Sequence, residues 1–123
     1  MNTKIILGDR QTGKTTELIK QSVALGAPIV CQFKDEPELI RKLAVENGIQ
    51  VPETIMASDL MEYQTSSSGR DFPNGICIDD PWMLLKTLLN YVDIAAVTVN
   101  LSDVVNIQLL TIENASRRKS SRK

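Results

Sequence analysis

The chain has 123 residues, a length that suits one domain with a modest hydrophobic core. Its net charge of −1 conceals an uneven distribution, because five of the fourteen basic residues lie in the last eight positions and the rest of the chain holds nine bases against fifteen acids. The apolar runs are too short to span a bilayer and no secretory signal is visible, so we expect a cytoplasmic protein with no membrane partner.

The amino-terminal stretch Lys4 to Thr16 reads KIILGDRQTGKTT and matches G-x-x-x-x-G-K-[ST] at every fixed position. The apolar run Ile5–Leu7 before it predicts a buried parallel strand. Apolar residues at helical spacing after it predict a helix that ends at Gly26. Strand, glycine loop and helix therefore follow in the order of a phosphate-binding loop. The alternative is a glycine turn that binds nothing.

The residue types of this loop suit phosphate chemistry. Glycines let main-chain N–H groups approach the phosphates, and the start of the next helix adds unpaired N–H donors and the positive end of its dipole. We expect Lys14 to reach the β- and γ-phosphates and the Thr15 hydroxyl to coordinate Mg²⁺. The expected nucleotide-binding residues of the loop are Gly8, Asp9, Arg10, Gln11, Thr12, Gly13, Lys14, Thr15 and Thr16. Thr16 either touches the α-phosphate or only begins the helix.

The middle of the chain predicts two further strand–helix units. The expected elements are a strand at Ile29–Phe33, a helix from Asp35-Glu36-Pro37 to Asn47-Gly48 with Leu39, Ile40, Leu43 and Ala44 on its apolar face, a short strand at Thr54–Ala57, and a brief helix capped by Ser58 or Asp59. Cys31 and Cys77 lie in apolar, strand-like stretches, and the chain has no histidine. We therefore expect buried, reduced thiols and no zinc site.

Two polar segments interrupt this pattern. Gln64 to Gly75 is rich in Ser, Gly and Pro and predicts a surface loop whose one base, Arg70, is either a phosphate contact or a solvated residue. The last eight residues, Ser116 to Lys123, are basic and have no apolar group to bury, so we expect a disordered tail over 115–123 after a domain that spans 1–114. The tail either contacts nucleic acid phosphates or is a solvated end.

An apolar strand that ends in two carboxylates follows the polar loop. Ile76-Cys77-Ile78 precedes Asp79 and Asp80, a pattern that holds Mg²⁺ downstream of a phosphate loop. We assign Mg²⁺ binding to Asp79 and the orientation or deprotonation of an attacking water to Asp80. The alternative is that the two acids and Pro81 only cap the next helix.

The last third predicts one helix and two strands. The helix is expected from Pro81 through Val92, with Leu84, Leu85, Leu88, Leu89 and Val92 as its buried stripe. Ala95–Asn100 predicts a strand, and Asn100 at its carboxyl end is a candidate sensor of the γ-phosphate. Alternation from Val105 predicts a final edge strand that ends near Glu113, with a helix capped by Ser102 as the alternative.

These motifs resemble the core of a P-loop NTPase of the RecA/ASCE-like division, over Met1 to about Asn114. Walker A corresponds to Gly8 through Thr15 and Walker B to Ile76 through Asp80. The resemblance implies an α/β, three-layer fold, with a parallel five-stranded sheet in the order 5-1-4-3-2 and helices on both faces. It also implies ATP and Mg²⁺ as ligands. The small size and basic tail look like a phage ATP-binding protein, which would act in a bacterial cell or a phage-infected host.

The same resemblance leaves three functions open. Relatives that hydrolyse ATP usually have Glu where this chain has Asp80, so hydrolysis is expected to be slow or to need a partner such as nucleic acid, another protein or a second copy. The run Gly13 to Leu18 also looks like the phosphate loop of thymidine kinases, but no cysteine cluster follows Cys77 to form their zinc-bearing lasso. The alternatives are therefore a small nucleoside or nucleotide kinase and a switch module that binds ATP without hydrolysing it.

Overall fold

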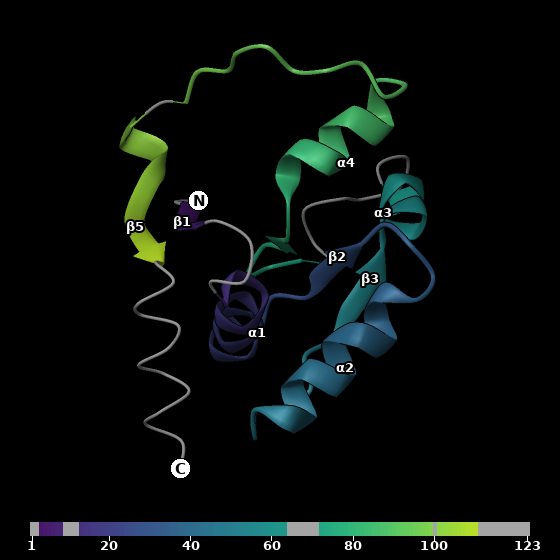
Figure 1. Ribbon diagram of the computed structural model, residues 1–123, viewed down its shortest axis with the longest axis vertical. Coiled ribbons are helices and arrows are strands. Elements are labelled where there is room, and N and C mark those ends of the chain that lie inside the picture. The colour runs from purple at the N-terminus through teal and green to yellow at the C-terminus, as the bar shows by residue number, and fades with distance from the viewer. Residues whose placement is uncertain (1–2, 9–12, 64–71, 100, 111–123) are drawn as a thin grey trace.

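In a computed structural model of the chain, the described residues are 3–8, 13–63, 72–99 and 101–110. Parallel strands alternate with helices along the chain, which confirms the mixed α/β class (Figure 1). The elements are β1 (Thr3–Gly8), α1 (Lys14–Leu25), β2 (Ile29–Cys31), α2 (Glu36–Glu46), β3 (Thr54–Met56), α3 (Ala57–Tyr63), β4 (Cys77–Ile78), α4 (Pro81–Leu88), the 3₁₀-helix η1 (Leu101–Asp103) and β5 (Val104–Leu110). Most of the predicted strands and helices of the first half therefore form.

Helix α1 has well-defined ends. It begins after Gly13, which has a φ of 85°, and ends at Gly26, which has a φ of 67° and donates its N–H to the carbonyl of Ser22. Both angles lie in the left-handed region that glycine adopts without strain. The buried Ser22 hydroxyl donates to the carbonyl of Ala27 at 2.5 Å, which fixes the turn into β2. The predicted end of this helix at Gly26 is confirmed.

The hydrophobic core lies where α1 and α2 pack against the central strands. Its buried members are Ile19, Ala27, Ile29, Cys31, Ile40, Ala44 and Cys77, with Leu18, Leu43, Ile49 and Met56 packed around them. Leu39 was expected on the apolar face of α2, but this side chain is 57% exposed. Ile40 and Ala44 fill the buried face of α2, and Leu39 is turned by one residue, about 100°, away from Ile40.

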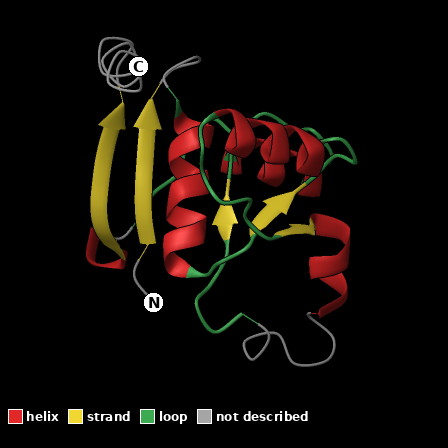
Figure 2. Cartoon of the chain, turned by 90° about the horizontal axis from the view of Figure 1, so that it is seen from below, coloured by secondary structure: helices red, strands yellow, loops and turns green. Residues whose placement is uncertain are grey.

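The strands form two small parallel sheets rather than the expected five-stranded sheet. One sheet has the order β3-β2-β4 and the other pairs β1 with β5. The expected order placed the third strand between the second and fourth, whereas β2 occupies that central position. β2 is the most apolar of the three, with all its residues buried, and a strand with neighbours on both sides is where such residues are best covered. Helix α1 contacts both β1 and β4 and so links the two sheets (Figure 2).

The region around α4 departs most from the sequence prediction. The helix ends at Leu88 rather than Val92, because Asn90 and Tyr91 both have positive φ values, which a helix does not permit. None of its residues is buried, so the expected buried stripe is wrong. Residues 92–99 have no regular structure, which makes the predicted strand at 95–100 wrong over 95–99. Position 100 lies outside the described residues.

The two short predictions around α3 and β5 have different outcomes. Helix α3 begins at Ala57, so Ser58 and Asp59 lie inside it rather than at its cap. The last strand is confirmed as β5, parallel to β1, with η1 at Ser102 instead of a longer helix. The predicted end of this strand near Glu113 and the basic tail lie outside the described residues.

Candidate functional site

The carboxyl end of β1 and the start of α1 flank the predicted phosphate loop. The first hydrogen bond of α1 joins the N–H of Glu17 to the carbonyl of Gly13 at 3.0 Å, so the N–H groups of Lys14, Thr15 and Thr16 have no partner within the helix. The N-cap residue is Gly13, which has no side chain to cap this end of the helix. These donors and the positive end of the helix dipole therefore face the predicted ligand position, as an anion-binding site requires.

The Lys14 side chain turns back toward the end of β1. Its Nζ donates to the carbonyl oxygen of Gly8 at 2.7 Å, and the side chain is half-buried. The ammonium group is thereby held at the end of β1, next to the first glycine of the motif. This position lets it exchange a neutral carbonyl for a charged phosphate oxygen, a stronger acceptor.

Thr15 and Asp79 meet although they are 64 residues apart in the chain. The Thr15 hydroxyl donates to Oδ2 of Asp79 at 2.8 Å, and both side chains are partly buried. Thr15 lies in the first turn of α1, and Asp79 follows the last residue of β4. The structure therefore brings together the two residues that the sequence assigned to the metal.

The second carboxylate, Asp80, makes a different contact from Asp79. It is the N-cap of α4, where its Oδ1 accepts a hydrogen bond from the Met83 N–H at 3.2 Å. Its backbone is in the left-handed region, with a φ of 54°, a conformation that Asp tolerates better than most residues. The two adjacent acids thus diverge: Asp79 reaches Thr15 and Asp80 caps a helix. The water-orienting role of Asp80 stays a prediction.

The other predicted site residues fall into two groups, one described residue and six that lie outside the described ranges. Thr16 is half-buried in the first turn of α1. The residues that lie outside the described ranges are Asp9, Arg10, Gln11, Thr12, Arg70 and Asn100, together with the basic tail. Their assignments stay predictions. The described part of the site is therefore the pair of contacts made by Lys14 and Thr15, with Gly8, Gly13 and Asp79 around them.

Cys31 is a neighbour of the site that the sequence did not assign to it. Its thiol is fully buried at the end of β2, and burial together with the charges of Glu36 and Asp79 raises its pKa to about 11. The register of β2 and β4 pairs Val30 with Ile78, so Cys31 lies level with Asp79. The signal was present in the sequence as a cysteine at a strand end, but only strand pairing shows which strand adjoins it.

Because the pKa of Cys31 is raised, the free energy of unfolding should change with pH in the alkaline range. The thiol holds its proton more tightly when folded, so its contribution to stability is complete below the unfolded pKa of 9.0 and is lost between pH 9 and about 11. We expect the free energy of unfolding to fall more steeply over this range in the wild type than in Cys31→Ala, because other titrating groups are common to both. Urea unfolding at a series of pH values measures the difference. Parallel pH profiles would contradict the assignment.

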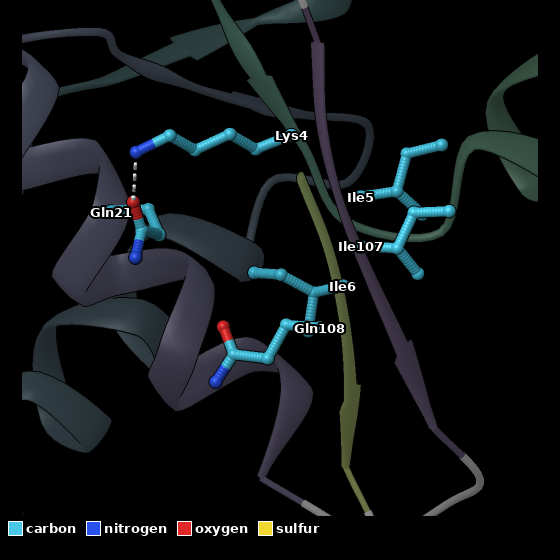
Figure 3. Close-up of a pocket in the computed structure, with 6 residues that line it drawn as sticks. All are labelled: Lys4, Ile5, Ile6, Gln21, Ile107 and Gln108. Atoms are coloured by element: carbon cyan, nitrogen blue, oxygen red, sulfur yellow. Dashed lines mark hydrogen bonds between the residues drawn. The ribbon is translucent and has the colours of Figure 1, made fainter. Parts of the chain in front are cut away.

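A pocket of about 390 Å³ lies apart from these contacts. It is lined by Lys4, Ile5, Ile6, Gln21, Ile107 and Gln108 (Figure 3). Lys4 Nζ donates to the side-chain oxygen of Gln21 at 3.4 Å across it. The lining residues come from β1, β5 and the second half of α1, and none of them was predicted as a site residue.

Comparisons with protein-family models, with curated proteins and with solved structures find no match for the chain. Among the described residues, no helix is long and apolar enough to cross a membrane. The same residues hold no group of three His, Cys, Asp or Glu side chains that could bind a metal ion. The functional argument therefore rests on the motif and on the contacts of Lys14 and Thr15.

Proposed function

We propose that this chain is an Mg²⁺-ATP-binding P-loop NTPase and a slow or partner-stimulated ATPase. The observation that carries the proposal is the 2.8 Å hydrogen bond between Thr15 and Asp79. A glycine turn that binds nothing would need no carboxylate at the first turn of the helix, and a pure capping role for the two acids would not direct Asp79 to Thr15. The pairing joins the two separate sequence motifs at one point.

The phosphates would bind at the start of α1. Lys14 would leave the Gly8 carbonyl and bind the β- and γ-phosphates, while the N–H groups of the first helical turn, which have no partner within the helix, donate to phosphate oxygens. Positioning and charge neutralisation supply most of the catalysis in phosphoryl transfer, so this arrangement needs no covalent step on the protein.

The donor set beside Lys14 suits Mg²⁺. A hydroxyl oxygen and a carboxylate oxygen are hard ligands, and Mg²⁺ in nucleotide sites is held by one or two protein oxygens together with phosphate and water oxygens. Thr15 would bind the ion directly, and Asp79 directly or through a water. Held by these two residues, Mg²⁺ would supply positive charge to neutralise the charge that develops during transfer. ATP is the default nucleotide of the family that the chain resembles.

Asp80 supports a low rate of hydrolysis. One of its oxygens is already engaged by the Met83 N–H, and its side chain is one methylene shorter than the Glu of efficient relatives. Both features weaken its ability to orient an attacking water. A partner would raise the rate by supplying a missing group. Nucleic acid, bound through Arg70 or the basic tail, is one candidate, and a protein or a second copy is another.

The capping role of Asp80 also favours a second candidate, a switch module that binds ATP without turning it over. Equal residual hydrolysis in Asp80→Asn and the wild type would favour the switch, because the carboxylate would then do no chemistry. A nucleoside or nucleotide kinase remains the enzyme alternative, and phosphoryl transfer to a panel of nucleosides tests it.

The proposal is tested by measuring Mg²⁺-dependent ATP hydrolysis with and without single-stranded and duplex DNA. We expect slow turnover that DNA stimulates and that Lys14→Ala abolishes. ATP binding that depends on Lys14 but gives no turnover under any condition would replace the ATPase by the switch. Turnover that survives Lys14→Ala would refute the assignment of the site.

A further inference from the structure

The outer edge of the β1–β5 sheet has the features of a strand that pairs with another chain. β5 is the outermost strand of the molecule, and within the described residues its only sheet partner is β1 (Figures 1 and 2). A strand in a two-stranded sheet uses only one side of its backbone, so alternate N–H and C=O groups of β5 point away from β1. These groups form a ready template for a further strand.

The sequence of β5 lacks three of the usual protections against edge pairing, although its register with β1 shifts between the pairs Thr3–Val104 and Lys4–Asn106. Its seven residues, VVNIQLL, contain no charge, no proline and no glycine. The edge strands of the other sheet, β3 and β4, have only three and two residues and offer much shorter templates. β5 therefore offers a longer template than β3 or β4, and unlike β1, the other strand of its own sheet, it carries no charged residue.

Exposed apolar side chains accompany this free edge. Ile107 is 55% exposed and Leu109 is 64% exposed, and both lie on the same face of the sheet as Leu7, which is 47% exposed. The register pairs Leu7 with Leu109, so these three side chains form one patch that runs to the outer edge. A strand added beside β5 would cover part of Ile107 and Leu109, which favours the pairing.

We propose that β5 pairs with β5 of a second copy of this chain, antiparallel about a two-fold axis. A two-fold interface requires a strand that is complementary to itself, and an uncharged strand whose outer edge has no partner among the described residues satisfies this condition. In full overlap the centre of the seven-residue strand, Ile107, lies opposite its own counterpart. The two β1–β5 sheets then become one four-stranded sheet with a continuous apolar patch on one face.

The test places a like charge at the symmetry axis. Ile107→Lys puts two ammonium groups opposite each other and should weaken dimerisation about tenfold or more. Leu39→Lys on α2 is the matched control, because Leu39 is 57% exposed and lies on a helix remote from β5. Light scattering at protein concentrations from micromolar to millimolar measures the molar mass. We expect twice the 13.7 kDa of one chain for the wild type and for the control.

Three outcomes would overturn the proposal. A wild type that stays monomeric at every concentration would show that β5 does not pair with a second copy. A mass that keeps rising beyond two chains would show open-ended association. A dimer that persists in Ile107→Lys would place the interface elsewhere. Circular dichroism checks that each variant is folded. If Ile107→Lys is not, Leu109→Lys takes its place, because Leu109 is 64% exposed and has less packing to lose, and its replacement puts an ammonium group into the apolar patch that the dimer would cover.

Discussion

Replacing Lys14 by Ala should remove most of the stabilisation of this protein by Mg²⁺-ATP. The ammonium group, now bonded to the Gly8 carbonyl, is the one charged donor among the described residues at the proposed phosphate position, so its loss should weaken nucleotide binding about 100-fold. At a nucleotide concentration a hundred times the wild-type Kd, binding stabilises the wild type by about 2.7 kcal/mol, or about 10 °C in melting temperature. The variant should shift by about 2 °C under the same conditions.

The matched control for this measurement is Lys42→Ala. Lys42 is an exposed residue of α2, so its removal changes the net charge equally without touching the loop. Without nucleotide, Lys14→Ala should cost about 1 kcal/mol of stability, because it removes one hydrogen bond to the backbone. An unchanged Mg²⁺-ATP shift in Lys14→Ala would show that nucleotide binds elsewhere or not at all.

Replacing Asp79 by Asn should separate magnesium binding from nucleotide binding. The amide oxygen can still accept the Thr15 hydroxyl, so the local contact survives while the negative charge is lost. We expect the wild type to bind ATP about tenfold more tightly with Mg²⁺ than with a chelator, and the Asp79→Asn substitution to erase that difference. Affinity for metal-free ATP should stay equal or rise, because a carboxylate that repels the phosphates has been removed.

The adjacent carboxylate supplies the control for this experiment. Asp80→Asn keeps an oxygen for the Met83 N–H, so it should preserve α4 and leave the magnesium dependence of ATP binding intact. Isothermal titration of each variant with ATP, with and without Mg²⁺, measures both effects. If Asp80→Asn lost the magnesium dependence and Asp79→Asn kept it, the roles of the two acids would have to be exchanged.

The sequence predicted the start of the site well because its signals are local. The strand and the helix are set by residues close together in the chain, namely the glycines at positions 8, 13 and 26 and the apolar spacing of α1. The predicted strand precedes the loop as β1 and the predicted helix follows it as α1. The type of residue near Thr15 was also predictable, since both a threonine hydroxyl and a carboxylate after a downstream strand suit Mg²⁺. What each acid contacts required the structure, because capping and metal binding have the same sequence pattern at Asp79-Asp80-Pro81.

The fold beyond the site was less predictable because it depends on which strands pair. β2 and β3 are both short apolar strands, and nothing in their residues states which one adjoins β4. The leucine spacing after Pro81 predicts a helix but not the positive φ angles of Asn90 and Tyr91 that end it early. The spacing also indicates which side chains share a face, not whether another element covers that face, and α4 has no buried residue.

The contacts of Lys14 and Thr15 have a mechanical consequence. The described strands form two sheets that share no ladder, and α1 packs against both. At the start of that helix, Lys14 is bonded to the end of β1 and the next residue, Thr15, to the end of β4. A ligand bound by both side chains would therefore connect the two sheets. Part of the binding free energy would hold the two sheets in one arrangement. A bound ligand would therefore make the protein more rigid as well as more stable.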